Sequence, residues 1–585
     1  MATECLVEGE LIFPKEMGTA ARFWRAITHR WDMIAILGLA ILLWLPRLSG
    51  PIDLRYDAGV YYLLGTSFAQ GHGYRIPSEP GSPQALQYPP LLPGIVAIYQ
   101  RALGTSDSLV VGPWLRKTYA FLFIGYALAV LALAKRFLSP GLALAAAALC
   151  LLHHQTIFLS DLLFAELPFG LLAVGFALIA AETSHASRSW LREAVLFALA
   201  TAGFLLRTAG LALLAAWVLE ALIRRRWRIV LLRTVLALVP IIAWQTYVTR
   251  VRASDEYSHP AYTYQRAPYQ YYNVSYAENA LLVDPFRPEL GRVNAATIAL
   301  RLTRNLPFLI QSTGQAVSTT KAQWRQLLRK SQSRVLGRVV IPLDVTIIPI
   351  FGFAALVIAG FFILVGRRAW STVLLLLGSI ALVWTTPWPA QFSRYLSPLI
   401  AFLAICFVLA LSRFDLALRK RQPSRMRAVA RAGLAGVLIL AFLMETYTGV
   451  RLFRERARPD GVVFQPGKHD AYRLFAHEET WRAWEKAVYW IDTNAPQDAI
   501  VATTAPHFSY LLTGRRAVLP PMESNPAYAR QLLEAVPVSY VIIDQLEFLD
   551  VSRRYARPAM EIPPPEWRVV NAVDGTQTFE RVAVP

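Results

Sequence analysis

The sequence is poor in cysteine and poor in charge. Its three cysteines, Cys5, Cys150 and Cys406, lie far apart in 585 residues, which excludes a disulfide framework and a cysteine-based metal cluster. Charged residues make up 17% of the chain, whereas an ordinary soluble protein carries about 25%. Because 55% of the residues are hydrophobic and many stand in runs of membrane-spanning length, the sequence predicts a polytopic α-helical membrane protein.

Acidic residues are also scarce relative to basic ones. The chain has 39 Asp and Glu against 59 Lys and Arg, a formal net charge of +20. Such an excess can indicate nucleic-acid binding, but here the basic residues concentrate in short loops between apolar runs, where membrane orientation places them. We therefore expect no nucleic-acid partner. The first segment carries Glu4, Glu8 and Glu10 and is not expected to be a cleavable signal.

Apolar segments recur along most of the chain, and we predict about eleven transmembrane helices. A single helix over 194–223 would bury Arg207 at the bilayer centre at a cost of roughly 3 kcal/mol or more, so we expect two helices there. The predicted spans are 31–48, 115–134, 141–158, 163–181, 194–206, 209–223, 229–248, 345–365, 371–386, 395–412 and 432–449.

Basic residues alternate between successive loops, which predicts the topology. Loops such as 224–228 and 413–431 are rich in arginine, whereas the loops between them hold almost none. The positive-inside rule then places segment 1–30 in the cytoplasm, and an odd number of spans places the C-terminus outside the cytoplasmic (inner) membrane. The transmembrane domain is predicted at 31–449, and three non-membrane segments share the outer face: loops 49–114 and 250–344 and the tail 450–585.

The tail 450–585 differs from the rest of the chain. Segments 499–503 and 538–544 have the pattern of buried strands, and they alternate with predicted helices at 480–493, 508–513 and 526–535. This alternation predicts a small α/β domain with a partly parallel sheet. The domain lacks a glycine-rich phosphate loop, so we do not expect dinucleotide binding. Acceptor docking and structural support both remain open.

Ionisable residues gather at the outer ends of the predicted spans. Charges at a membrane interface are costly unless they are paired or used, so such a cluster predicts a functional site, with interfacial solvation as the alternative for each residue. Adjacent histidines on a helix would point about 100° apart, which is poor geometry for one ion, and we expect no metal site. The residues concerned are Asp53, Arg55, Asp57, His153, His154, Asp161, Glu166, Arg207 and Arg394.

The first outer loop has a pattern of its own. Asp57 and Tyr61 are four residues apart and share one face of a short predicted helix, which ends at the Gly-His-Gly-Tyr run at 71–74. The Tyr-Pro-Pro-Leu-Leu-Pro run beginning at Tyr88 fits a chain break followed by the first turn of a new helix. We therefore predict a helix, an extended stretch and a second helix lying at the interface.

In these motifs the sequence resembles the GT-C class of membrane glycosyltransferases, especially bacterial relatives of the protein O-mannosyltransferases and of the transferase that adds aminoarabinose to lipid A. The resemblance extends over about 31–412. It departs from the family at Ala58, where an acidic residue is expected beside Asp57. It rests on the first-loop motifs and on three later ones, Glu-Leu-Pro at 166–168, Arg-Thr-Ala-Gly at 207–210 and Arg-Tyr-Leu-Ser-Pro at 394–398.

The resemblance implies transfer of a sugar from a polyprenyl-phosphate donor to a hydroxyl of a lipid, glycan or protein acceptor at the outer membrane face, inverting and without a cofactor. Asp57 would be the general base. Arg207 and Arg394 are candidates for the lipid phosphate, which guanidinium binds in bidentate fashion. Glu166 is a candidate for holding the acceptor or a sugar hydroxyl. The predicted substrate-binding residues are Tyr61, Tyr88, Glu166, Arg207, Arg394 and Tyr395.

Two other functions compete with this one. A transporter or flippase would show internal repeats and helices broken at the midplane, and we find no repeat; a non-catalytic scaffold would bind through its tail. Seven tyrosines in 257–276 suit either sugar stacking or the membrane interface. The Asn-Val-Ser at 273–275 matches a glycosylation sequon by letters alone. A basic helix is predicted at 321–338, resting on membrane lipids.

Overall fold

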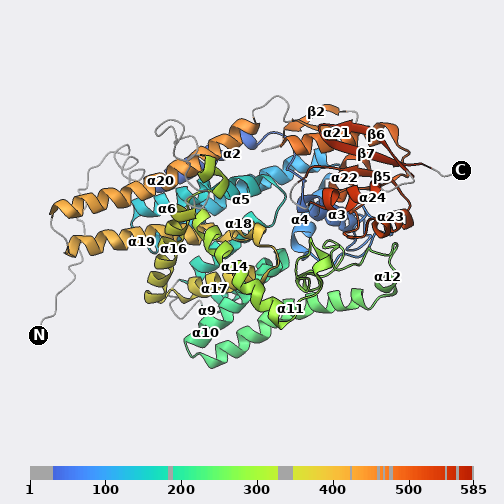
Figure 1. Cartoon of the computed structure of the whole chain (residues 1–585). Helices are drawn as coiled ribbons and strands as arrows, with labels where there is room; N and C mark the ends of the chain where they lie inside the picture. Colours follow the sequence, from blue (N-terminus) through green and yellow to red (C-terminus); the bar gives the residue numbers. More distant parts are fainter. Residues whose placement is uncertain are drawn as a thin grey trace, which may run out of the picture.

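The computed structural model describes residues 30–181, 189–326, 347–421, 424–456, 462–465, 468–473, 478–546, 550–561 and 566–582. Long helices form one end of the molecule, and a small mixed sheet with its own helices forms the other, next to the C-terminus (Figure 1). The predicted segment 1–30 and most of the predicted basic helix 321–338 lie outside the described residues.

Each predicted span coincides with a helix or a bent pair of helices. Five described segments are long and apolar enough to cross a membrane, or six if the bent pair α6–α7 counts as one span. The number of spans and the face on which each loop lies therefore stay predictions. The helices are α2 (Trp31–Trp44), α5 (Ser108–Lys135), α6 (Pro140–Leu152), α7 (His154–Asp161), α8 (Glu166–Ala180), α9 (Ser189–Leu206), α10 (Leu211–Ile223), α11 (Trp227–Arg252), α16 (Ile347–Gly366), α17 (Trp370–Thr385), α19 (Ile400–Arg421) and α20 (Ser424–Arg456).

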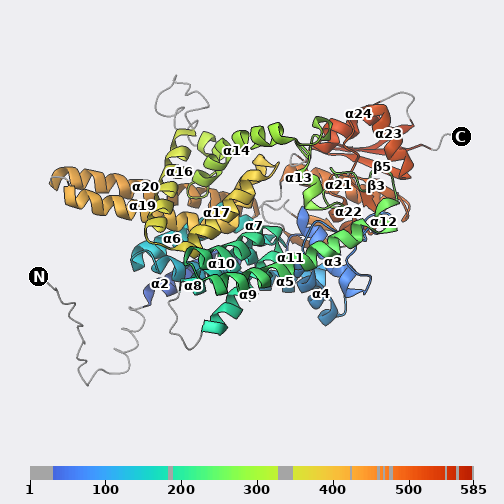
Figure 2. The ribbon, with the colours of Figure 1, turned by 90° about the horizontal axis from the view of Figure 1, so that it is seen from below.

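The helical core is centred on α19, which is buried along most of its apolar length. Helix α16 packs directly against it, because a Cβ on Gly360 would overlap the carbonyl of Cys406 and only glycine lets the two backbones meet. Helix α20 runs beside α19 and is mostly exposed (Figures 1 and 2). Helices α9 and α10 are separated at Arg207 by a short 3₁₀ turn, η3 (Thr208–Gly210), so two helices stand where the sequence predicted two.

The first loop folds as the sequence predicts. After the 3₁₀ turn η1 (Leu45–Arg47) it forms α3 (Asp57–Ala69), an extended stretch, and α4 (Leu91–Leu103). It is anchored to the turn before α8, since Asp53 N donates to Asp161 O at 3.1 Å and Leu163 N donates to Asp53 O at 3.1 Å. This pairing brings the start of α3 close to the start of α8.

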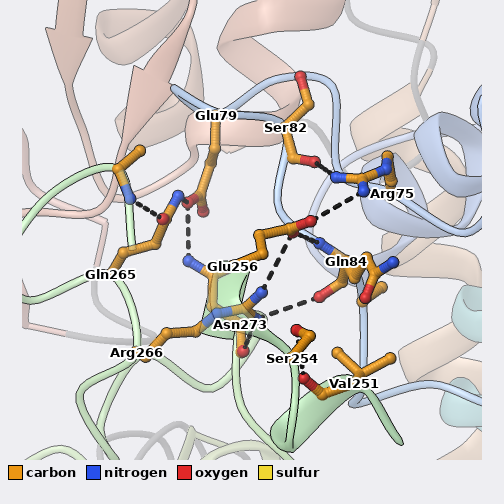
Figure 3. Close-up of polar contacts among 12 residues, drawn as sticks. Arg75, Glu79, Ser82, Gln84, Val251, Ser254, Glu256, Gln265, Arg266 and Asn273 are labelled. Atoms are coloured by element: carbon orange, nitrogen blue, oxygen red, sulfur yellow. Dashed lines mark hydrogen bonds and ion pairs between the residues drawn. The ribbon is translucent and has the colours of Figure 1, made fainter. Parts of the chain in front are cut away.

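The second loop is fastened across the first by a polar network that is buried around Glu79 and partly exposed at Arg75 and Glu256 (Figure 3). The carboxylate of Glu79 accepts from Asn273 Nδ2 at 2.7 Å and from Tyr262 OH at 2.9 Å. Arg75 forms an ion pair with Glu256 at 2.8 Å. The sequon residue Asn273 is therefore fully buried, and its side chain is hydrogen-bonded to Glu79. The elements of this loop are α12 (Asp255–Ser258), α13 (Tyr276–Ala280), η4 (Pro288–Leu290) and α14 (Ala295–Gln315).

The C-terminal part contains the mixed sheet that the sequence predicts, in the order β4-β3-β5-β7-β6. Strand β3 runs parallel to β4 and β5, whereas β7 is antiparallel to β5 and β6. Strands β1 and β2 form a separate antiparallel pair. The elements are β1 (Val462–Gln465), β2 (Lys468–Arg473), α21 (Glu479–Asn494), β3 (Ile500–Ala502), α22 (Pro506–Thr513), β4 (Ala517–Val518), α23 (Pro526–Ala535), β5 (Val538–Ile543), η8 (Ser552–Ala556), α24 (Arg557–Met560), β6 (Trp567–Val573) and β7 (Thr576–Arg581).

This C-terminal part packs on the first loop. Helix α22 lies against α3 at Gly59, where an added Cβ would contact His507. From α21, Trp481 donates its indole N–H to Tyr56 OH at 3.1 Å. The residue immediately before Asp57 is therefore held by a segment more than 400 positions away in the sequence.

Candidate active site

A cavity of about 310 Å³ lies where the first loop, the α9–α10 turn, the second loop and the chain leading into α19 meet. That last stretch is irregular, with η6 (Pro389–Gln391), α18 (Phe392–Tyr395) and η7 (Ser397–Leu399). Glu166 is not among the residues that line this cavity. The other predicted site residues all line the cavity: Asp57, Tyr61, Tyr88, Arg207, Arg394 and Tyr395.

Four charged side chains form an alternating chain along one wall. Arg394 Nη2 lies 2.5 Å from Asp57 Oδ2, and Arg394 Nε donates to Glu166 Oε1 at 2.9 Å. Arg207 Nη1 forms an ion pair with the same Glu166 oxygen at 3.0 Å. Glu166 is 4% exposed, whereas the other three side chains are 17–22% exposed. Two cations thus face the cavity, held by one buried carboxylate.

Asp57 is presented by a strained backbone. Tyr56, the residue before α3, has φ 57° and ψ −137°, a conformation unfavourable for a residue with a side chain. It is held there by Trp481 and Phe164, whose rings lie 5.1 and 6.5 Å from its own. Asp57 then occupies the first position of the helix, where the helix dipole favours a negative charge.

The two arginines are positioned by breaks in the helices. Arg394 belongs to the four-residue helix α18, and its guanidinium lies 4.3 Å from the ring centre of Phe164. Arg207 is extended, with φ −150° and ψ 142°, between α9 and η3. Its guanidinium is 6.0 Å from the ring of Tyr395. Cation–π contacts of this kind orient a guanidinium without removing its charge.

An aromatic wall faces the charged chain. Tyr271 and Tyr272 have ring centres 4.3 Å apart, and Tyr276 lies 5.4 Å from Trp388. Tyr272 OH donates to Asp57 Oδ1 at 3.3 Å. Burial raises the pKa of Tyr272 well above its usual value, and the neighbouring Tyr271 and Asp57 raise it further. Its hydroxyl is therefore a neutral hydrogen-bond donor at physiological pH.

The C-terminal part supports this wall from behind. The ring of His507 stands edge-on to Tyr272 at 4.5 Å, and its Nδ1 lies 2.7 Å from Ser78 Oγ. Burial lowers the pKa of His507 to about 3, so the ring is neutral at pH 7. Nothing in the sequence singles out His507, and Tyr272 is distinguished there only as part of the tyrosine-rich segment 257–276. The tyrosine-rich segment was the sequence feature from which the aromatic wall could have been predicted, whereas no sequence feature pointed to His507.

Other predicted polar residues lie outside the cavity. Asp53 pairs with Arg55 at 2.7 Å, and Asp161 with Arg116 at 3.4 Å, each pair almost completely buried. Interfacial solvation, the alternative considered for Asp53 and Asp161, is therefore wrong. Ala58 is also fully buried.

The expectation that the two adjacent histidine side chains point about 100° apart on one helix is wrong as well. The helix breaks at His153, which has φ −59° and ψ 129°, and α6 and α7 are bent by 52°. As a result the two rings, of His153 and His154, lie side by side with centres 4.4 Å apart instead of pointing apart on one helix.

The fold has counterparts among solved structures, although no family model and no curated protein matches the sequence. The archaeal oligosaccharyltransferase AglB from Archaeoglobus fulgidus, in complex with an inhibitory peptide and a dolichol-phosphate, superposes with a TM-score of 0.53 at 13% identity, over 97% of this chain and 75% of that one. Its apo form gives 0.51 at 14% identity, over 89% and 70%. ArnT from Cupriavidus metallidurans bound to undecaprenyl phosphate gives 0.49 at 13%, over 95% and 98%. The superpositions on the two Archaeoglobus fulgidus structures show that the chain has the fold of a GT-C glycosyltransferase, the class that its motifs resemble.

Proposed function

We propose that this protein is a membrane glycosyltransferase that moves a sugar from a polyprenyl-phosphate donor to an acceptor hydroxyl at the outer face of the cytoplasmic membrane. One observation carries the proposal: Asp57, Arg394, Glu166 and Arg207 form a connected chain of charges at a cavity that is also lined by many aromatic side chains. The AglB structure of the same fold contains a dolichol-phosphate, a donor-type lipid.

The cationic side of the cavity suits a lipid phosphate. Arg207 and Arg394 are both partly exposed to the cavity, and guanidinium groups bind phosphate oxygens in bidentate fashion. Their guanidinium groups are brought together by the single buried carboxylate of Glu166. We assign Glu166 to this positioning, because its two arginine contacts and its burial leave it little access to an acceptor. Preorganised cations of this kind stabilise the charge that develops on a departing phosphate.

Asp57 suits the role of general base. In this structure Asp57 is paired with Arg394, whose Nη2 lies 2.5 Å from Asp57 Oδ2. A donor phosphate that engages Arg394 would draw the guanidinium away and leave the carboxylate available to the acceptor. The acceptor oxygen then attacks the anomeric carbon while its proton passes to Asp57. The bond from that carbon to the phosphate oxygen breaks, and the polyprenyl phosphate leaves with the electron pair, so one displacement inverts the configuration.

The aromatic side of the cavity suits the sugar. Tyr61, Tyr88 and Tyr272 form a continuous row of rings, with centres 4.7 Å and 6.4 Å apart, that leads from the charged wall. Rings of this kind stack on the apolar faces of sugars, and their hydroxyls donate hydrogen bonds. The cavity volume of about 310 Å³ is at the lower end for small-molecule sites, which suits one sugar unit and the phosphate, with the lipid outside.

The proposal is tested by transfer in cells. Lipids and glycans of the cell envelope are compared by mass spectrometry in strains with the gene, without it, and with it restored. A sugar that disappears with the gene and returns with it identifies product and acceptor class. No difference in any envelope fraction would contradict the proposal. A transporter or flippase, the alternative function, forms no glycosidic bond. Purified protein given both the donor lipid and the acceptor would then release no polyprenyl phosphate, whereas a transferase would release it.

A further inference from the structure

A second cluster of ionisable side chains lies outside the cavity, where α20 crosses the break between α6 and α7. His153, His154 and Glu445 are all buried, and one potential ligand atom from each lies within 4.8 Å of the others. His153 Nε2 is 3.7 Å from Glu445 Oε1, and His154 Nδ1 is 3.8 Å from Glu445 Oε2. The residues are almost 300 positions apart, so the fold itself assembles them.

These groups are incompletely satisfied by the rest of the protein. Among the described residues, both ring nitrogens of His154 and the Oε1 atom of Glu445 are buried without a hydrogen-bond partner. Glu445 Oε2 accepts the backbone N–H of His154 at 3.2 Å. Separations of 3.7–3.8 Å are too long for hydrogen bonds between the side chains. Buried polar groups are rarely left unpaired, so the arrangement points to a shared partner between them.

We propose that this cluster binds a divalent transition-metal ion of the zinc type. Two imidazoles and a carboxylate are a frequent zinc donor set, with bonds of about 2.0–2.2 Å, which places ligand atoms roughly 3.4 Å apart in a tetrahedron. The two histidine–glutamate separations, 3.7 and 3.8 Å, reach that value with shifts of a few tenths of an ångström, and all three ligand atoms lie within 4.8 Å of one another. A single ion would satisfy Glu445 Oε1 and His154 Nδ1 at once.

His153 completes the site through a change of tautomer. Its Nδ1 accepts the backbone N–H of Gln155 at 3.1 Å, which leaves the ring proton on Nε2, directed at Gln315 O 3.2 Å away. Coordination through Nε2 would require that proton to move to Nδ1, so His153 would give up both the hydrogen bond from Gln155 N–H and the one to Gln315 O. His154 makes no such exchange, so His154 and Glu445 are the dominant ligands.

The ion would have a structural role. It would join α20, which leads to the C-terminal part, to α7, whose Gln155, Phe158 and Leu159 line the cavity. Helix α20 is mostly exposed, so such a cross-link would fix it where packing is sparse. The inference is independent of the proposed function, since it needs neither donor nor acceptor.

Metal analysis of the full chain tests the inference. The protein is purified in detergent with a tag that contains no histidine, treated with a chelator, incubated with ZnCl₂ and desalted before elemental mass spectrometry. We expect about one zinc ion per chain for the wild type, as for a preformed structural site. His154→Ala and Glu445→Gln should lose it. His259→Ala is the matched control, because His259 is an exposed histidine 77% accessible to solvent, and it should retain the ion.

Two results would overturn the inference. One is a wild-type chain that retains no zinc after incubation; the other is a wild-type stoichiometry that His154→Ala and Glu445→Gln leave unchanged, which would place the ion elsewhere. Thermal unfolding of the wild type guards against variants that do not fold: zinc should raise its Tm and a chelator should reverse the rise. An unchanged Tm in both conditions would contradict a structural ion.

Discussion

Replacing Arg394 with lysine separates the charge of this residue from its geometry. In the structure the guanidinium uses Nη2 for Asp57 and Nε for Glu166, so one side chain bridges two carboxylates. Lysine retains the charge but offers a single nitrogen, and it cannot stay on Glu166 while it engages a phosphate. The variant therefore loses one charge-assisted contact to the donor and keeps the long-range attraction.

The expected magnitude follows from that one contact. A hydrogen bond to a charged group contributes about 1.5–3 kcal/mol. Each 1.4 kcal/mol changes Kd tenfold, so this range corresponds to roughly 10- to 100-fold weaker donor binding. Arg394 is 22% exposed, and water partly screens its contacts, which favours the lower end of the range.

The assay is direct binding of undecaprenyl phosphate to the purified full chain, followed by native mass spectrometry. Arg75→Lys is the matched control, since Arg75 also pairs with a carboxylate, Glu256 at 2.8 Å, but both side chains are about one-third exposed and lie outside the cavity. That control should bind as the wild type does. Wild-type affinity in Arg394→Lys, with correct folding, would refute the assignment of this arginine to the phosphate.

Three further predictions concern the layers around the cavity. Glu166→Gln leaves two guanidinium groups without their shared anion. It should lower the free energy of unfolding by about 2–4 kcal/mol, which is the usual cost of breaking a buried ion pair reduced because the arginines are partly exposed. Thermal unfolding measures this change. Unchanged stability would contradict the bridge. Tyr272→Phe removes a 3.3 Å hydrogen bond to Asp57 and should lower kcat no more than about tenfold, so a complete loss of transfer would contradict this supporting role. In the folded protein the pKa of His507 is about 3, whereas the ordinary pKa of histidine is 6.5. The neutral ring therefore stabilises the fold fully above pH 6.5, and this stabilisation is lost as the pH falls. Between pH 7 and 5 the free energy of unfolding should fall by about 2 kcal/mol, and His507→Asn should reduce this loss in pH-dependent denaturation. An identical pH dependence in wild type and variant would refute it.

The charged half of the site was predictable from the sequence. Ionisable residues near membrane spans are costly, so Asp57, Arg207 and Arg394 stood out individually, and alternating loop charges assigned them to one face. The structure brings all three to one cavity. The sequence also singled out Glu166. Its burial, however, depends on contacts with Arg207 and Arg394, which lie at two distant breaks between helices, and no local sequence pattern encodes such contacts.

The supporting half was not predictable. Tyr272 reaches Asp57 because the second loop is fastened to the first through Glu79, 194 positions from Asn273. The position of His507 depends on the packing of α22, from the C-terminal part, against α3. Contacts of such sequence separation leave no periodic signal. The break at His153 was missed for a local reason, since neither proline nor glycine marks it.

The substitution Asp57→Asn tests whether Asp57 takes the proton of the acceptor hydroxyl. The variant is restored to the strain lacking the gene, and envelope lipids and glycans are compared by mass spectrometry at matched protein levels in the membrane. The amide keeps the shape of the side chain but cannot take a proton, so we predict that the missing sugar does not return. Purified Asp57→Asn should still bind undecaprenyl phosphate at least as tightly as the wild type, because Arg394 no longer pairs with a carboxylate there. Restoration of the sugar to wild-type levels by this variant would contradict the account.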